Sequence, residues 1–350
     1  MKNIEKEIAI TGVCVLSSAG ETASALCEHS ISGKPMDQQI DLQLYEKEIK
    51  DFDTGSRELY RIQKLLLVAF LKSVHMAGIK TELIAPEMVS VFLGNSYGSE
   101  EFKSEFFRIY KGSTPPLTSP KLFPFTNANS LASWLAIQAK AKGPSLTFVS
   151  GSTSSAEAVF AACDALIAKE CEVAFVGGAN IIANSLSDEF HTSGFKYESV
   201  AMLVMEKADN VRSSGRKYMA ILKGRQSKML TNEQINKLKY KNPMSAVDDE
   251  VRAHSNTDPA EIMYLGNNLG DNVFGCDKIE AKEKKKVFFL NDAIGNGFDA
   301  AGVLGIGLTI DLLNSSKNIV WCPFALPQKN ILYSSVGSSG NAVTMLVSKA

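Results

Sequence analysis

The stretch SLTFVSGSTSSAEAVFAACDALIAKECEVAFVGGAN, residues 145–180, contains a complete strand–turn–helix–strand unit. Residues 145–150 and 172–179 are short apolar or β-branched runs with the length of buried strands. Between them, residues 154–169 repeat apolar side chains every three or four positions, which predicts an amphipathic helix. Strands that alternate with helices are typical of α/β proteins, so this stretch predicts that fold class.

The same alternation continues on both sides of this unit. Further strands are expected at residues 7–16, 88–94, 200–208, 217–224 and 286–292, further helices at 22–33, 57–78 and 300–313, and a terminal hairpin at 330–350. The connection between strands 200–208 and 217–224 is short, which predicts that they are neighbours. The polar stretch at about 225–257 is expected to be a surface insertion with a helix. The pattern indicates two similar halves with one shared core and mostly buried strands.

The composition excludes several classes of protein. The chain has 350 residues, 45% of them hydrophobic and 21% charged, with a net charge of −1, and it shows no arginine-rich stripe, so no nucleic-acid partner is expected. The longest apolar run, residues 65–71, is far shorter than the ~20 residues of a membrane span. The six cysteines lack CxxC spacing and no secretory signal precedes them, which predicts free thiols and a cytoplasmic location. We expect no metal and no cofactor.

Several segments, taken in chain order, resemble the β-ketoacyl synthases, the condensing enzymes of the thiolase fold. They are residues 8–35 (IAITGVCVLSSAGETASALCEHSISGKP), 123–180, 258–268 (DPAEIMYLGNN), 291–305 (NDAIGNGFDAAGVLG) and 336–347 (VGSSGNAVTMLV). The resemblance implies two similar βαβαβαββ halves that form a five-layered α-β-α-β-α core. The ketoacyl-synthase N-terminal region would then occupy residues 1–195, and residues 196–350 would form the second half, with the variable insertion at about 225–257.

The resemblance also places the family's functional positions on this chain, and each carries a different residue here. The nucleophilic cysteine corresponds to Ser152, the first histidine to Asn268 or Leu269, the lysine to Asn291, the second histidine to Asn296, and the gating phenylalanine to Ser338 beside Gly337. By the same resemblance Leu269, Gly337 and Ser338 would contact substrate. The Cys-His-His triad is therefore expected to be absent.

Ser152 allows two interpretations. As a nucleophile it needs a general base, because a thiol has a pKa near 8.5 but a hydroxyl lies much closer to the value of about 15.7 for water. A helix N-terminus contributes at most about 2 kcal/mol, or roughly 1.5 pK units, which is too little to form an alkoxide. Of the four histidines, His29, His75, His191 and His254, the most plausible base is His191. Alternatively, Ser152 caps the helix that follows it.

The asparagines are open to two interpretations as well. Asn268, Asn291 and Asn296 either donate amide N–H groups to a thioester carbonyl or bridge buried backbone groups. Two basic clusters, Arg57, Arg61 and Lys64 at successive helical turns and the run Lys282 and Lys284–Lys286, would either meet an acidic acyl carrier protein or form solvated faces.

Two functional hypotheses follow. The first is a non-catalytic, chain-length-factor-like partner of an active ketosynthase in fatty acid, polyketide or aryl-polyene biosynthesis. It would form a heterodimer with that ketosynthase, or a homodimer, through the region around the strand that precedes Ser152. The second is an acyltransferase or 3-oxoacyl-carrier-protein synthase-like enzyme that uses Ser152 with the asparagines as oxyanion donors. Whether the chain is an enzyme stays open at this point.

Overall fold

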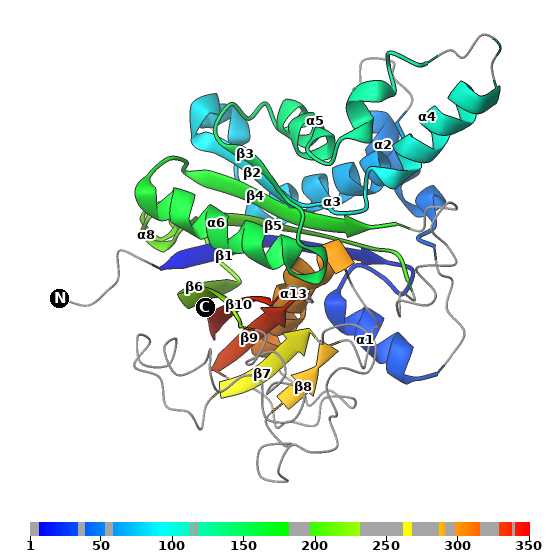
Figure 1. Cartoon of the computed structure of the whole chain (residues 1–350). Helices are drawn as coiled ribbons and strands as arrows, with labels where there is room; N and C mark the ends of the chain where they lie inside the picture. The colour runs from blue at the N-terminus through cyan, green and yellow to red at the C-terminus, as the bar shows by residue number, and fades with distance from the viewer. Residues whose placement is uncertain are drawn as a thin grey trace.

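The protein is described from a computed structural model of the whole chain (Figure 1). The structure describes residues 7–33, 39–52, 59–112, 114, 118–181, 197–231, 262–267, 287–290, 298–315, 329–337 and 340–350. The strands are β1 (Ile8–Ser17), β2 (Val89–Gly94), β3 (Ser145–Phe148), β4 (Val173–Asn180), β5 (Ser199–Lys207), β6 (Ala220–Met229), β7 (Ile262–Asn267), β8 (Val287–Phe289), β9 (Asn330–Val336) and β10 (Asn341–Lys349).

The α-helices are α1 (Ala23–Ile31), α2 (Glu46–Asp51), α3 (Arg61–Ala77), α4 (Glu100–Gly112), α5 (Ser130–Gln138), α6 (Ser154–Ala168), α8 (Ala208–Ser213) and α13 (Ala301–Asn314). Short 3-10 turns are η2 (Leu42–Tyr45), η3 (Thr81–Leu83), η4 (Pro86–Met88), η5 (Phe123–Thr126), η6 (Gly151–Thr153) and η10 (Phe298–Ala300). The strand and helix ranges expected from residues 145–180 agree with β3, α6 and β4. In contrast, the sequence pattern did not predict α4 and α5.

The strands form one mixed sheet with internal symmetry. Their order is β3-β2-β4-β5-β1-β6-β10-β9-β7-β8, so β6–β10 repeat the order of β1–β5 in reverse. The pairing directions repeat too: β2 is parallel to β3 and β4, and β7 is parallel to β8 and β9, while β1, β4 and β5 pair antiparallel in the same way as β6, β9 and β10. The described strands therefore form two similar half-sheets, as the sequence predicted.

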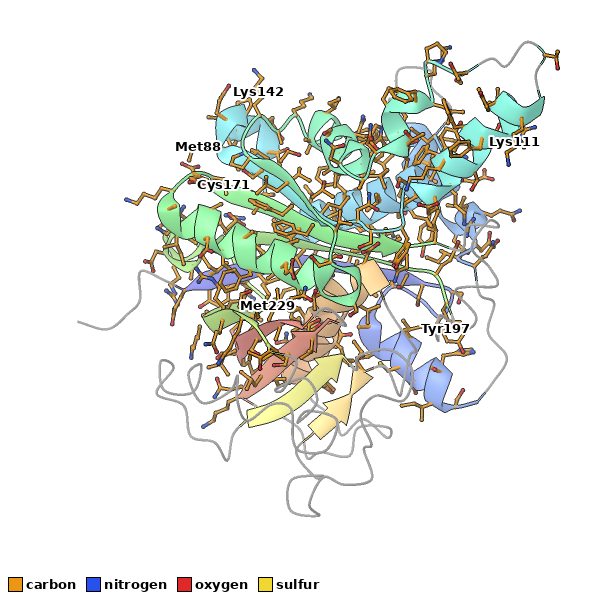
Figure 2. The ribbon with its side chains drawn as sticks, viewed as in Figure 1. Met88, Lys111, Lys142, Cys171, Tyr197 and Met229 are labelled. Atoms are coloured by element: carbon orange, nitrogen blue, oxygen red, sulfur yellow. The ribbon has the colours of Figure 1, made fainter. Side chains whose placement is uncertain are left out.

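Strand β1 joins the two halves. It pairs with β5 on one side and, through Ile8–Ile10, with β6 on the other. The expectation that β5 and β6 are neighbours is therefore wrong, because a long-range strand separates them. Strand β6 also extends to Met229, labelled in Figure 2, and its residues 225–229 pair with β10, whereas the insertion was expected to begin near 225. Residues 232–257 lie outside the described ranges.

Helices α6 and α13 lie between the half-sheets. Their apolar side chains share one core with the inner faces of both halves, and α3 and α5 cover the outer face of β1–β5 with a second core. In β1, Ile8, Ile10, Val13 and Val15 face the inner core. The change from even to odd numbers coincides with a register shift between Ile10 and Gly12, where a bulge turns the strand. The described residues thus form four layers: the outer helices, the first half-sheet, the central helices and the second half-sheet. The expected fifth layer would lie on residues outside the described ranges.

Close contact between the two central helices depends on glycine. A Cβ on Gly302 of α13 would lie 2.2 Å from the backbone nitrogen of Ala156 of α6. Likewise, a Cβ on Gly178 of β4 would lie 2.2 Å from the carbonyl oxygen of Asp299 in η10. No larger residue fits at either place without moving backbone. The glycine-rich sequence of α13 therefore brings its start against the start of α6.

Candidate functional site

Ser152 is the middle residue of η6, the turn between β3 and α6. Gly151 enters the turn with φ of +59°, a conformation that glycine adopts without strain. Ser152 is partly exposed, and its carbonyl oxygen accepts a hydrogen bond from the hydroxyl of Ser335 in β9 at 3.3 Å. Within the described part of the chain, no group hydrogen-bonds to the Ser152 hydroxyl. A nucleophilic serine would need such a proton acceptor.

The alternative role of Ser152 as a helix cap is wrong. The residue in the cap position of α6 is Thr153, and it makes no side-chain cap bond. The N–H groups of the turn are instead satisfied by other hydroxyls: Ser154 Oγ accepts from the Ser150 N–H at 2.9 Å, and Ser96 Oγ accepts from the Gly151 N–H at 3.0 Å. Ser96 follows β2, so the turn is held by a loop far away in the sequence.

Glu157 places a carboxylate at the start of α6. Its Oε2 accepts a hydrogen bond from Ser150 Oγ at 2.7 Å, and its Oε1 accepts from Thr153 Oγ1 at 3.2 Å and from the Asn341 side chain. An anion in the first helical turn interacts favourably with the partial positive charge of the helix N-terminus. The Glu157 carboxylate offsets that partial positive charge, so the start of α6 would stabilise an alkoxide or thiolate at Ser152 less than a helix start without an acidic residue.

The terminal hairpin reaches the same turn. The N–H of Gly337 donates to the Asn341 carbonyl oxygen at 2.7 Å, and a Cβ on Gly337 would lie 3.2 Å from Thr153 Oγ1. The structure thus brings Gly337 and Ser152 into one region, although they are 185 positions apart in the sequence (337 − 152). Contact of Gly337 with substrate stays a prediction.

Asp299 is a site residue that the sequence reasoning missed. It is fully buried in η10, and its Oδ2 accepts from the backbone N–H groups of Ser96 at 2.6 Å and Tyr97 at 2.9 Å. Its Oδ1 has no hydrogen-bond partner among the residues that the structure describes. Burial raises the pKa of the carboxyl to about 6 against the opposing effect of the hydrogen bonds. One signal was available: a single acid in the otherwise uncharged run FDAAGVLGIGLTI, residues 298–310.

Other predicted residues lie outside the described ranges. These are Asn268, Leu269, Asn291, Asn296, Ser338, His191 and His254. His29 and His75 lie in the last turns of α1 and α3. Among the described residues, no group of three His, Cys, Asp or Glu side chains is arranged to hold a metal ion. Nor is any of the described helices long and apolar enough to span a bilayer.

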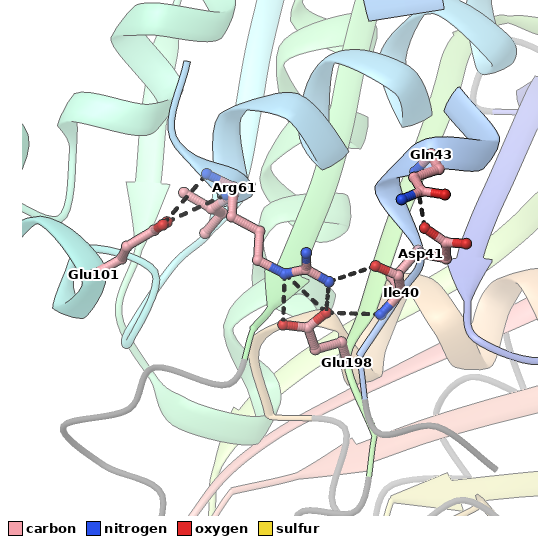
Figure 3. Close-up of polar contacts among 7 residues, drawn as sticks. Ile40, Asp41, Gln43, Arg61, Glu101 and Glu198 are labelled. Carbon is pink, nitrogen blue, oxygen red and sulfur yellow. Dashed lines mark hydrogen bonds and ion pairs between the residues drawn. The ribbon is translucent and has the colours of Figure 1, made fainter. Parts of the chain in front are cut away.

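Arg61 does not belong to a basic surface, contrary to both interpretations of the Arg57–Arg61–Lys64 cluster. Its guanidinium forms an ion pair with the fully buried Glu198, with Nη2 2.6 Å from Oε2 and Nε 3.1 Å from Oε1, and also donates to the Ile40 carbonyl oxygen (Figure 3). The pair joins the start of α3, the residue before β5 and the segment after α1. Arg61 therefore stabilises the fold and is not available to an acidic carrier protein; Arg57 and Lys282–Lys286 lie outside the described ranges.

Comparison with known proteins confirms the resemblance. Residues 52–195 match the family model described as "Beta-ketoacyl synthase, N-terminal domain". This region has the ketosynthase fold. Over 98% of the chain, the structure superposes on 99% of a β-ketoacyl synthase from Burkholderia phymatum with a TM-score of 0.74 and 15% identity. It superposes equally far on a chain of the ishigamide ketosynthase/chain length factor, with a TM-score of 0.70 and 15% identity.

The curated relatives are much longer proteins. A phenolphthiocerol/phthiocerol polyketide synthase of Mycobacterium tuberculosis is 27% identical over 183 residues, which is 46% of this chain but 8% of that protein. A highly reducing polyketide synthase of Cryptosporiopsis is 30% identical over 122 residues, 35% of this chain and 5% of that protein. The chain thus spans a small part of each relative, and at 15% identity the superpositions establish the thiolase-like, mixed α/β fold alone.

Proposed function

We propose that this chain is a non-catalytic, chain-length-factor-like partner of an active ketosynthase. The observation that carries this proposal is the state of the Ser152 turn. The backbone of the turn is bonded by Ser96, Ser154 and Ser335, while no described proton acceptor contacts the Ser152 hydroxyl. Glu157 adds a negative charge where condensation would require a stabilised anion. The fold is retained, but the surroundings of Ser152 do not allow it to react as a nucleophile.

The edge of the sheet at β3 supports a protein partner. Among the described strands, β3 pairs with β2 alone, so one row of its backbone groups has no described partner strand and could pair with another chain. Apolar side chains around this edge are exposed: Leu146 by 47%, Val149 by 60% and Ile137 of α5 by 71%. An exposed strand edge with apolar neighbours is typical of a surface that is covered in an assembly. We propose that the active ketosynthase covers it.

The similar proteins favour polyketide synthesis over fatty acid and aryl-polyene synthesis. The two curated relatives described above are polyketide synthases, and one superposed structure is a ketosynthase/chain length factor. Another is a type II polyketide ketosynthase in complex with its acyl carrier protein, with a TM-score of 0.70 and 17% identity. We propose that this chain also meets a carrier protein, through a surface other than Arg61, whose charge is paired with Glu198.

The proposal is tested by co-expression with candidate ketosynthases and by measuring the mass of the complex. We expect a heterodimer that loses condensing activity when the active ketosynthase's cysteine, and not Ser152, is replaced. Leu146→Asp should break the complex because it places a charge at the strand edge. Leu44→Asp is the matched control, because Leu44 is 70% exposed in η2, which packs against α2 and α3. A chain that condenses acyl groups alone, as a homodimer, would overturn the proposal.

The alternative enzyme, which uses Ser152 with asparagine oxyanion donors, gains no support from the described residues. Its expected base, His191, and its asparagines lie outside them. The Ser152 hydroxyl has no described proton acceptor. We therefore propose the partner role and not this reaction.

A further inference from the structure

A cavity lies in the outer layer of the protein, where α2 and α3 meet β1 (Figure 1). Its volume of about 610 Å³ falls within the range of small-molecule sites, about 300–1,000 Å³. Neither the Ser152 turn nor the β3 edge contributes to it, so the proposed function gives it no role. Among the described residues it is lined by Val13, Cys14, Glu21, Glu48, Leu71, Lys72, His75 and Met76.

The charged side chains of this cavity come from three separate segments. Lys72 of α3 has its Nζ 3.0 Å from Oε1 of Glu21, which follows β1, and 3.3 Å from Oε1 of Glu48 in α2. The same Nζ lies 5.4 Å from the centroid of the Tyr45 ring. Lys72 is therefore already held by two anions and an aromatic ring. With the His75 imidazole neutral, one ammonium against two carboxylates leaves the lining with a net charge of −1.

The rest of the lining is apolar. Val13 of β1 and Leu71 and Met76 of α3 present hydrocarbon and thioether groups, and Met76 is 52% exposed. Methionine adapts its shape to different apolar partners. Burial raises the pKa of the Cys14 thiol to about 12, so this side chain stays neutral and adds to the apolar surface. The cavity thus combines a negative charge with apolar walls.

We propose that this cavity binds a small amphipathic organic cation. The ammonium group of the ligand pairs with Glu21 and Glu48, and its hydrocarbon part packs against Val13, Leu71 and Met76. The two carboxylate side chains are 48% and 34% exposed, so a second cation reaches them. A carboxylate also has more acceptor sites than one ammonium group occupies. This site goes beyond the partner role and does not depend on it.

The same contacts disfavour the other classes of ligand. An anion would have to displace Glu21 or Glu48 from Lys72 and would then lie beside the displaced carboxylate. A neutral apolar molecule would contact the walls but would gain nothing from the net charge. Lys47 of α2 also acts on Glu48, but it is exposed and does not line the cavity, so water and salt screen its charge. The class of ligand is therefore an amine with a hydrocarbon tail.

NMR titration of the full chain, labelled at its methionine methyl groups, with n-hexylamine at mildly alkaline pH tests the proposal. We expect a saturable shift of the Met76 methyl signal, which the loss of one signal in Met76→Leu assigns. The signal of Met229, which is exposed on β6 and does not line the cavity, should stay in place. 1-Hexanol should bind about tenfold more weakly because it carries no charge, and hexanoate should cause no saturable shift.

Substitution of the carboxylates tests the charge directly. Glu21→Gln and Glu48→Gln should each weaken the binding of n-hexylamine about fivefold, the size expected for a partly exposed ion pair. Both side chains reach solvent, so the isosteric amides should not prevent folding. Glu46→Gln is the matched control, because Glu46 lies on the same helix, pairs with Lys50 and does not line the cavity. It should change the affinity less than about twofold.

Three results of the titration would overturn the inference: no shift of the Met76 signal, equal affinity for 1-hexanol, or a preference for hexanoate. Equal weakening by Glu46→Gln and Glu48→Gln would overturn it too, because the amine would then respond to the general charge of the surface and not to the cavity. Complex formation with a ketosynthase is measured separately by sizing, so failure of one proposal does not affect the other.

Discussion

Each of the two central helices, α6 and α13, is preceded by a 3-10 turn, but the middle residues of the two turns have different surroundings. Helix α6 is preceded by the 3-10 turn Gly151–Thr153 and helix α13 by the 3-10 turn Phe298–Ala300, at equivalent places in the two halves. The middle residue is Ser152 in the first turn and Asp299 in the second. Ser152 is partly exposed and its hydroxyl is unbonded to described groups, whereas Asp299 is buried and binds two N–H groups of the β2 loop.

This difference shows that position in the repeat does not determine chemistry. The first turn lies beside the terminal hairpin, where Ser335 and Asn341 bond its backbone and its threonine. The second turn lies against β4 and the loop after β2, where Asn180 Oδ1 accepts the Asp299 N–H at 3.1 Å. Equivalent backbones thus present one residue to the surface and the other to the core.

The largest expected effect is on the free energy of unfolding, and it comes from an ion pair outside the two turns. Arg61→Ala leaves the buried Glu198 carboxylate without its partner and should lower the free energy of unfolding by about 3–5 kcal/mol. Urea denaturation measures it. Arg108→Ala is the control, because its ion pair with Glu105 is exposed to water and screened by salt, and it should change stability only slightly. Equal effects of the two substitutions would refute the role given to Arg61.

Breaking the contact between the two helices comes next. Gly302→Ala places a Cβ against the backbone nitrogen of Ala156 and should lower the free energy of unfolding by about 3 kcal/mol, since backbone has to move. Gly112→Ala at the end of α4 meets nothing within 4 Å and should have little effect. Thermal unfolding of both variants measures the difference. A Gly302→Ala protein as stable as the native one would mean that the two turns are not held as close as described.

Asp299→Asn tests the burial of the second turn through the pH dependence of the free energy of unfolding. The folded pKa of about 6 lies above the ordinary 3.8, so the native protein loses stability as pH rises from about 4 to about 6, where the buried group ionises. Two pK units correspond to about 3 kcal/mol. Because asparagine does not ionise, the variant should gain up to about 2–3 kcal/mol relative to the native protein between about pH 4 and pH 7.5. Denaturation at both pH values measures the gain; a constant difference would show that Asp299 keeps an ordinary pKa.

The smallest effect concerns the first turn. In Ser152→Cys, the Glu157 carboxylate should keep the thiol pKa from falling as it ordinarily does at a helix N-terminus. Adding Glu157→Gln should lower that pKa by about half a unit, since single charges at helix ends contribute about 0.3–1 kcal/mol. The rate of iodoacetamide alkylation against pH measures it. Equal pKa values in the single and double variants would remove the electrostatic argument against a reactive Ser152.

Much of the fold was predictable because its signals are local. The period of the apolar residues indicated β3, α6 and β4 within one or two positions, and the glycines of α13 indicated a closely packed helix. Helix α4 was missed because charged and aromatic residues share its sequence and only Phe102 is buried. The neighbours of β5 were wrong because the order of strands depends on β1, which is about 190 residues away in the sequence (199 − 8 = 191).

The candidate site was only partly accessible from the sequence. Ser152 was found, and the residues that bond its turn were not, since Ser96, Ser335 and Asn341 come from three separate segments. Arg61 was expected at the surface because its spacing with Lys64 follows helical turns. Spacing along a helix says which side chains share a face; it does not say what covers that face.

The amino-acid sequence by itself determined the alternation of strands and helices and the two similar halves; that the catalytic positions carry no cysteine or histidine stays a prediction of the resemblance. Only the tertiary structure decided that Asp299 lies beside Ser96, 203 residues away in the chain, and that Glu198 neutralises Arg61. Periodicity follows from the geometry of the backbone over a few residues. Which distant side chains meet depends on how whole layers pack to bury their apolar faces, and no short stretch of sequence contains that information.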